Sequence, residues 1–293
     1  MSAVTVDRPS LRPAGALPPE RKQSFASRKL RWARDHMIQF FAACALFYMF
    51  LPVFVVLAFS FNQPAGRFNY VWNHFSFAAW PGVLQDQDIT SAVSLSLRIG
   101  FVATLVATVL GTLIAFAIGR HRFAGRGLIN LFIFMPMATP EVVMGASLLA
   151  LFINLGVDGQ LGFVTITIAH IMFCISFVVV TVKARIAGLD PRLEQAAMDL
   201  YADEKTTFYK VTFPLVLPGI VAGALLAFSL SFDDFVITNF TAGGQAITFP
   251  IYVWGASGKG IPPEANVVGS AMFIIALVVV LIPELARRRS KTS

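Results

Sequence analysis

Long apolar stretches separated by polar segments dominate this chain. A helix needs about 20 mostly apolar residues to cross a bilayer, and six stretches meet that requirement. They cover residues 38–61, 91–118, 128–155, 161–182, 213–237 and 267–285. The pattern predicts an all-α, polytopic membrane protein with six transmembrane helices.

The composition agrees with a membrane protein. The chain is 56% hydrophobic and 13% charged, whereas soluble domains carry about 25% charged residues. Its two cysteines, Cys44 and Cys174, lie in apolar stretches and offer neither a disulfide framework nor a zinc pattern. A net charge of +7 would suggest nucleic acid in a soluble protein. Here it has another explanation, because the charge is sorted between alternate loops, so we expect membrane lipids and no nucleic acid as partners.

Lys and Arg gather in alternate polar segments. They occur in the N-terminal segment 1–37, which alone has eight, in the loop after the second span, in the loop 183–212, and in the tail 287–293. The loops between these segments contain Arg67 and Lys259. The positive-inside rule therefore predicts that both termini and the loop 183–212 are cytoplasmic.

The same patterns divide the chain into three parts. Residues 1–37 read as a basic, disordered arm because they combine Pro, Arg and Ser, and the basic residues near Trp32 suit anionic head groups. Residues 38–286 form the transmembrane domain, and 287–293 a cytoplasmic basic tail. The arm is too long and too charged for a signal peptide and no A-x-A-like site follows the first span, so we expect that span to remain as an anchor.

The segment between the fourth and fifth spans is polar and helix-forming. Asp190 can cap a helix and Pro191 suits its first position. Glu194 then falls in the first turn, where the helix dipole favours a carboxylate. One apolar stripe follows at helical spacing, made of Leu193, Ala196, Ala197 and Leu200. Its acidic content suits an anionic membrane surface poorly, which favours a protein partner.

This loop resembles the EAA motif of importer-type ABC permeases, in which E-A-A, a Gly some four residues on and a later L-P precede the next span. The match reads Gln195-Ala196-Ala197, then Asp199-Leu200-Tyr201-Ala202, then Phe213-Pro214. Gln195 stands where the family usually has Glu, although Glu194 precedes it. The resemblance implies a coupling helix that docks into a groove on an ATPase subunit through Glu194, Gln195, Ala196, Ala197, Asp199, Leu200, Tyr201 and Ala202.

Tyr201 departs from that family pattern. It occupies the position where the family has Gly, which allows a tight turn between two short helices. A bulky residue at positive φ is costly. We therefore expect an altered bend or a different local contact at Tyr201, with docking kept.

Three further stretches resemble spermidine/putrescine-type permeases, most of all the second of the two permease subunits in those systems. They lie within residues 132–152, 228–240 and 262–272, and their order and spacing carry the likeness. It implies the importer-type ABC permease fold in a bacterial inner membrane and a chain with no catalytic or metal site and no bound cofactor. The implied partners are ABC ATPase subunits that hold ATP and Mg²⁺, a second homologous permease and a periplasmic solute-binding protein.

Carboxylates within the predicted spans are candidates for a solute path, because such groups are costly unless they face a bundle interior or water. Glu141 follows Pro140 in the third span, and Asp233 and Asp234 lie in the fifth, towards its outer end. Carboxylates and aromatic faces such as Phe235 and Trp254 can replace the water around an ammonium group. The alternative is that the Asp pair forms the interfacial polar end of a helix. Adjacent helical residues point about 100° apart, so at most one Asp faces the path squarely.

Two further features predict local geometry. Pro136 and Pro140 are expected to break or kink the third span beside Glu141, where an unwound path-lining segment could form. Gly219 and Gly223 form a G-x-x-x-G that permits close approach of helices, and we interpret it as packing.

Two other classes of function compete with a permease. The first is a membrane enzyme or electron carrier. A haem-binding bundle needs facing histidines, but only His170 lies within a predicted span, where a hydrogen bond between helices is expected, and no Ser/His/Asp or metal constellation is evident at membrane depth. An ATP-independent channel or secondary transporter would explain the spans and the Asp pair but not the helical loop. The chain lacks the phosphate-binding G-x-x-x-x-G-K-[ST] pattern, so ATP would be hydrolysed elsewhere. Within the ABC interpretation, polyamines lead and 4-aminobutyrate or an opine is the alternative solute.

Overall fold

The computed structural model describes residues 25–66, 69–258 and 260–290, with side chains for 36–66, 69–258, 260–279 and 281–282. These residues confirm an all-α protein. The strands among them are Asn62–Gln63 (β1) and His74–Phe75 (β2), which pair antiparallel with Asn62 opposite Phe75. The chain divides into two compact units, Met1–Val55 and Val56–Ser293.

The helices follow one another along the chain with short connections. In order they are α1 (Phe25–Phe59), α2 (Ala79–Gly82), α3 (Gln87–Arg120), α4 (Arg126–Ala138), α5 (Glu141–Asn154), the 3₁₀ turn η1 (Asp158–Gln160), α6 (Phe163–Ala187), α7 (Arg192–Asp199), α8 (Glu204–Thr207), the π turn η2 (Phe208–Thr212), α9 (Phe213–Phe232), α10 (Val236–Thr241), α11 (Phe249–Ser257) and α12 (Pro263–Ser290).

Both ends of the predicted transmembrane domain extend further as helix than expected. Helix α1 begins at Phe25, so residues 25–37 are helical where the sequence analysis expects disorder. No proline occurs between Pro19 and Pro52, and Arg, Lys, Leu and Ala in this stretch favour a helix. The predicted tail 287–293 begins within α12. Residues 1–24 and 291–293 lie outside the described residues.

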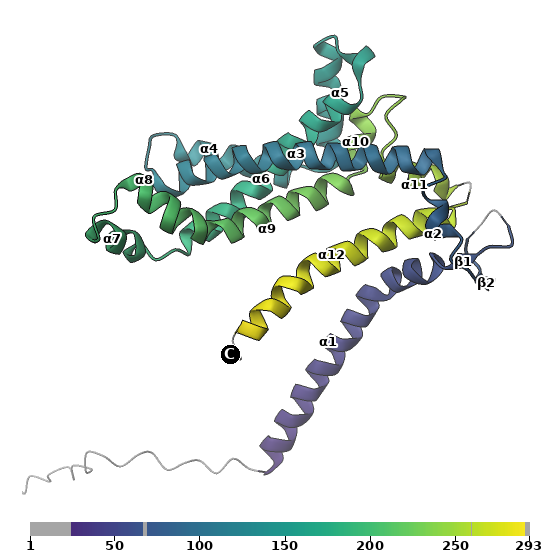
Figure 1. The fold of residues 1–293 in the computed structure, drawn as a ribbon, viewed down its shortest axis with the longest axis horizontal. Coiled ribbons are helices and arrows are strands. Elements are labelled where there is room, and N and C mark those ends of the chain that lie inside the picture. Colours follow the sequence, from purple (N-terminus) through teal and green to yellow (C-terminus); the bar gives the residue numbers. More distant parts are fainter. Residues whose placement is uncertain (1–24, 67–68, 259, 291–293) are drawn as a thin grey trace, which may run out of the picture. The chain divides into compact units, whose positions relative to one another are not determined.

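Helices α3, α6 and α9 pack along one another (Figure 1). They contribute most of the larger of the two clusters of buried apolar side chains among the described residues. Glycines bring the helices close together. A Cβ on Gly111 of α3 would lie 2.8 Å from the Cβ of Val178 on α6, and one on Gly219 of α9 would lie 2.6 Å from the Cβ of Arg185 on α6. Gly223 also faces Val178. Both glycines of the G-x-x-x-G thus face α6, as a packing motif predicts, and Gly219 is the one that leaves no room for a Cβ.

The predicted third span is broken into two helices. Helices α4 and α5 meet at 106° (Figure 1). The residue before a proline is disfavoured in the helical region, and Thr139, which precedes Pro140, is extended with ψ 131°. The expected break beside Glu141 is confirmed, and it lies at Pro140, since Pro136 is inside α4.

The predicted fifth span, 213–237, ends earlier than expected. Helix α9 ends at Phe232, and three residues separate it from α10. Apolar residues continue beyond this point, which is why the sequence suggested a longer helix. The Asp234 carboxylate accepts hydrogen bonds from the backbone N–H groups of Ile237 and Thr238, so a new helix starts there instead.

Within the described residues, four helical segments are long and apolar enough to cross a membrane, and the bent α4–α5 pair makes a fifth if it counts as one span. The four are His36–Phe59, Gln87–Arg120, Phe163–Ala187 and Glu204–Phe232. The sixth predicted span falls in α12, where Pro263–Val279 is a shorter apolar helix. The multi-pass architecture is thus present, while the count of six and the orientation of the termini stay predictions.

Candidate functional site

Helix α7 starts where the sequence predicts. The Asp190 side chain accepts a hydrogen bond from the N–H of Arg192 at 2.9 Å, and its carbonyl accepts one from Leu193 at 3.2 Å. These bonds satisfy N–H groups that have no partner inside the first turn. Glu194 lies in that turn.

The end of α7 is a tight left-handed turn. The N–H of Tyr201 donates to the Met198 carbonyl at 3.0 Å, and the N–H of Ala202 donates to the Ala197 carbonyl at 3.1 Å. This pair of bonds is the Schellman arrangement, which usually has glycine at its left-handed position. Tyr201 takes that position with φ 63°. Of the two expected outcomes, an altered bend is wrong, because the backbone bonds of the cap hold the bulky residue in the conformation that suits glycine. A different local contact at Tyr201 stays a prediction.

A second cap follows directly and leads back to the bundle. The Asp203 carboxylate accepts the N–H of Thr206 at 3.0 Å and starts α8. Hydrogen bonding from Thr206 lowers the pKa of this exposed carboxyl, so it stays ionised. Helix α8 and the π turn η2 then run into α9 at Phe213.

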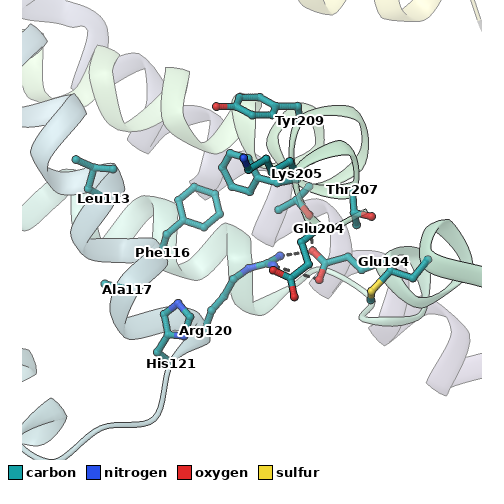
Figure 2. Close-up of a pocket in the computed structure, with 13 residues that line it drawn as sticks. Leu113, Phe116, Ala117, Arg120, His121, Glu194, Glu204, Lys205, Thr207 and Tyr209 are labelled. Atoms are coloured by element: carbon teal, nitrogen blue, oxygen red, sulfur yellow. Dashed lines mark hydrogen bonds and ion pairs between the residues drawn. The ribbon is translucent and has the colours of Figure 1, made fainter. Parts of the chain in front are cut away.

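The Glu194 carboxylate is bound inside the chain (Figure 2). It forms a two-pronged ion pair with Arg120, at the end of α3, in which one guanidinium nitrogen lies 3.1 Å from its partner oxygen. The Thr212 hydroxyl donates to the same carboxylate at 2.5 Å. The hydrogen bond from Arg120, helped by that from Thr212, lowers the pKa of Glu194 against the opposing effect of partial burial. One residue of the loop thus ties α7 to the ends of α3 and η2.

A pocket of about 760 Å³ lies beside this ion pair, between the end of α3 and the α7–η2 segment (Figure 2). Phe116 of α3 and Phe208 of η2 meet edge to face across it, with ring centroids 5.4 Å apart. Arg120 and Glu194 also line it. The ion pair and this aromatic contact both join the loop to α3 beside the pocket.

The outer surface of the loop is exposed. Among the residues expected to dock, Ala197 and Ala202 are half-buried, Glu194 is turned towards Arg120, and the others are exposed: Gln195, Ala196, Asp199, Leu200 and Tyr201. Leu193 and Met198 on α7 are 46% and 47% exposed. The predicted apolar stripe thus includes side chains that are not covered by this chain.

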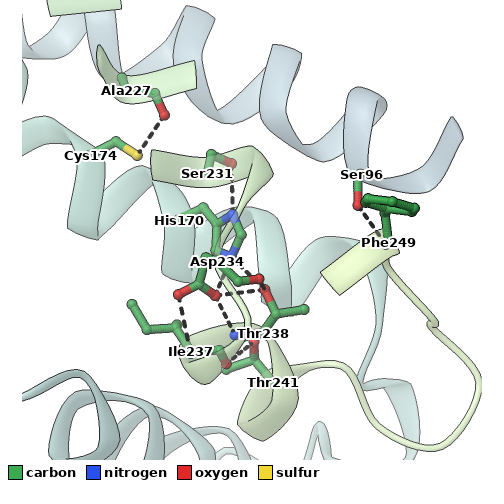
Figure 3. Close-up of polar contacts among 10 residues, drawn as sticks. All are labelled: Ser96, His170, Cys174, Ala227, Ser231, Asp234, Ile237, Thr238, Thr241 and Phe249. Atoms are coloured by element: carbon green, nitrogen blue, oxygen red, sulfur yellow. Dashed lines mark hydrogen bonds and ion pairs between the residues drawn. The ribbon is translucent and has the colours of Figure 1, made fainter. Parts of the chain in front are cut away.

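The two adjacent aspartates have different environments. Asp233 caps the end of α9 and is exposed, whereas Asp234 is buried in a polar cluster between α6, α9 and α10 (Figure 3). Asp234 accepts from the Thr238 backbone at 2.7 Å and the Thr238 hydroxyl at 2.7 Å. Its carboxylate lies 3.3 Å from His170 Nε2. The Asp234 side chain is therefore committed to holding the α9–α10 junction.

His170 is hydrogen-bonded between helices, as the sequence predicts. Its Nδ1 lies 2.7 Å from the Ser231 hydroxyl of α9, and its Nε2 lies 2.9 Å from the Thr238 hydroxyl of α10. Sequence reasoning did not foresee that Asp234 would be its acidic neighbour. The signal was available, since both are polar residues inside predicted spans, where such groups pair with one another.

The remaining candidates for a solute path lie on three different elements. Phe235 and Trp254 are brought together, with ring centroids 4.9 Å apart at 33°, and Trp254 is 67% exposed. Glu141 is exposed in the first turn of α5. Helix α5 packs on α10, where Gly145 lies against the ring of Phe240. Asp233, whose carboxylate is exposed, lies two residues before Phe235, the member of this aromatic pair at the α9–α10 break.

Residues 107–289 match the family of binding-protein-dependent transport system inner membrane components. The chain is 34% identical to the spermidine/putrescine transport system permease protein PotC of Haemophilus influenzae over 243 residues, which cover 83% of this chain and 93% of that protein. It is 36% identical to PotC of Escherichia coli K12 over 82% of this chain and 90% of the relative. It is 37% identical to the putrescine transport system permease protein PotI of the same strain, over 75% of this chain and 79% of the relative.

Solved structures resemble the fold. A bacterial alginate ABC transporter in complex with an alginate pentasaccharide-bound periplasmic protein matches with a TM-score of 0.64 and 16% identity, over 90% of this chain and 97% of that chain. An amino acid ABC transporter with histidines matches with a TM-score of 0.52 and 17% identity, over 72% of this chain and 97% of that chain. At these identities the likeness concerns the fold alone.

Proposed function

Because the chain belongs to the family of binding-protein-dependent transport system inner membrane components, we propose that it is the permease subunit of an ATP-driven ABC importer for putrescine and spermidine in the bacterial inner membrane. The observation that supports polyamines as the solute is the 34–37% identity, over most of the chain, to permeases named for these polyamines. Transport is the role of this subunit, and a partner subunit hydrolyses ATP.

The α7–η2 segment is the coupling element of this proposal. Its capped, rigid backbone and its exposed outer residues suit docking into a groove of an ABC ATPase. The ion pair between Glu194 and Arg120 and the bond from Thr212 join this segment to α3 and to the start of α9. Closure of the ATPases would thus displace the ends of two packed helices together.

The solute path of the proposal runs past the α9–α10 break. A polyamine carries ammonium groups that must exchange water for carboxylates and aromatic faces. Asp233 is exposed, Phe235 and Trp254 form an aromatic pair, and Glu141 is exposed at the break of the third span. Asp234 contributes by holding the junction, since its carboxylate is bound by Thr238 and faces His170.

The remaining parts of the machine follow from the family. A periplasmic solute-binding protein would deliver the polyamine, a second homologous permease would complete the pathway, and two ATPase copies with ATP and Mg²⁺ would bind on the cytoplasmic side. Both termini and the loop 183–212 are assigned to that side by their Lys and Arg content.

Uptake of labelled putrescine and spermidine tests the proposal. Cells without their own polyamine importers would carry this permease with its neighbouring operon genes, with either an active or an ATPase-dead subunit. We expect uptake only with the active ATPase. Uptake in both strains would favour an ATP-independent channel. If the complex assembles and hydrolyses ATP without taking up polyamines, the chain remains an importer permease but polyamines are excluded as its solute. Uptake of 4-aminobutyrate and opines would then be tested.

A further inference from the structure

Tyr201 has an unusual backbone for an exposed residue. It is the one non-glycine residue with positive φ within the described part of the chain, at φ 63°. A side chain makes this left-handed conformation unfavourable, because Cβ crowds the following carbonyl. Yet 99% of the Tyr201 residue surface is exposed. The strain is therefore not offset by packing of the ring within this chain.

The turn that carries Tyr201 is held by hydrogen bonds on both sides. The cap bonds to Met198 and Ala197 fix its backbone, and the Asp203 cap fixes the next helix. Leu200, next to it, is 82% exposed. Two large apolar side chains thus project from a preorganised turn, which reduces the entropy lost when a partner binds.

The surroundings of the two side chains are acidic. Asp199, Asp203 and Glu204 are exposed around them, with Lys205 as the basic neighbour. An anionic membrane surface would repel such a turn. A protein pocket with apolar walls and a rim of Lys or Arg would match both the two side chains and the charge around them.

We propose that Leu200 and Tyr201 form a knob that inserts into an apolar, basic-rimmed pocket of the ATPase subunit, and that Tyr201 is its anchor. This inference rests on the proposed function. Aromatic side chains are enriched among the residues that dominate binding at interfaces. The strained conformation serves to point the Tyr201 ring away from the chain. A glycine at this position would leave Leu200 as the only large side chain of the knob.

Binding of the purified ATPase subunit to the solubilised permease complex tests the knob. Tyr201→Gly and Tyr201→Ala both remove the ring, and the Gly variant also removes the strain. We expect each to weaken ATPase binding at least about tenfold, with the Gly variant unfolding at the same or a higher temperature than the natural chain. Tyr201→Phe keeps the ring and is expected to keep the affinity.

Leu84→Ala is the control, because Leu84 is a large apolar residue, 81% exposed, with ordinary backbone, and it lies just after α2, outside the coupling element. It should bind the ATPase within about twofold of the natural chain. Equal affinity for the Gly, Ala and natural chains would overturn the knob, as would an equal loss in Leu84→Ala.

Ala197→Arg separates this inference from the proposed function. It adds a large charged side chain to a half-buried position of α7. Loss of binding in Ala197→Arg with normal binding in both Tyr201 variants would reject the knob and keep the coupling element. Normal binding in all three variants would reject the docking assignment itself.

Discussion

The carboxylate of Glu194 is held by the guanidinium of Arg120, a residue 74 positions earlier in the chain. The pair joins a short loop helix to the end of a long membrane helix. In sequence Glu194 looks like part of a docking surface, but in the structure its charge is already neutralised within the chain. A change at either residue therefore alters how the loop is attached, in addition to whatever surface it presents.

The strength of this attachment can be measured with a double-mutant cycle. We expect Arg120→Ala and Glu194→Ala each to destabilise the chain and to be non-additive by about 1 kcal/mol, because the pair is partly exposed. Thermal unfolding in detergent gives the free energies. Asp199→Ala is the control, since Asp199 is exposed on α7 and does not line the pocket that Arg120 and Glu194 share, so its cycle with Arg120 should show no coupling. Strict additivity would mean that the ion pair does not hold the loop.

The same pair predicts a pH dependence. Arg120 lowers the pKa of Glu194 below its ordinary value of 4.5, so the folded chain binds this proton less tightly than the unfolded chain. The stabilisation is complete above pH 4.5 and is lost as the pH falls through the lowered pKa. Glu194→Gln should therefore unfold at a lower temperature than the natural chain at neutral pH, with a gap that narrows in acid. A difference in unfolding temperature between the two chains that does not change with pH would exclude this titration of Glu194.

Two glycines of α9 should respond to alanine in opposite ways. At Gly219 the new methyl group would lie 2.6 Å from the Cβ of Arg185, whose Nε is fixed by the Leu215 carbonyl. We expect overpacking to cost about 1–3 kcal/mol. At Gly223 the nearest atom is 3.5 Å away, so alanine should be neutral or stabilising by up to about 1 kcal/mol through its helix propensity. Thermal unfolding measures both effects. A lower unfolding temperature for Gly223→Ala than for Gly219→Ala would contradict the close packing of Gly219 against Arg185.

The two aspartates should separate folding from transport. Asp234→Asn replaces a buried carboxylate, whose two oxygens accept hydrogen bonds from Ile237 and Thr238, by an amide with a single acceptor oxygen. Losing a hydrogen bond to a charged group costs about 1.5–3 kcal/mol. We expect a poor yield of folded protein in size-exclusion chromatography. Asp233→Asn should fold normally and raise the KM for spermidine uptake, since Asp233 is exposed. A well-folded Asp234→Asn that fails in uptake would place Asp234 in the path instead.

Local signals predicted much of this structure. Asp190 and Pro191 marked the start of α7, Pro140 marked the break of the third span, and the position of His170 in an apolar stretch implied a hydrogen bond between helices. In each case the cause lies within a few residues, as a cap, a missing N–H or an isolated polar group. Such causes are visible in sequence without knowing the neighbours.

The other features depend on contacts between distant residues. Asp233 and Asp234 have the same chemistry and adjacent positions, and only the packing of α6 against α10 decides that one is buried and the other exposed. The Arg120 partner of Glu194 is likewise set by where α3 ends. At Tyr201 the unfavourable energy of a bulky residue at positive φ predicted a changed bend. The backbone hydrogen bonds of the helix cap keep the bend nevertheless.

The 106° corner at Pro140 gives the two halves of the third span different packing partners. Helix α4 is fastened to α6, where Lys183 donates to Asn130 at 2.7 Å, while α5 rests on α10 through Gly145 and Phe240. A straight helix could not turn from one of these partners to the other. Because of the corner, one predicted span packs against α6 through α4 and against both α10 and α6 through α5.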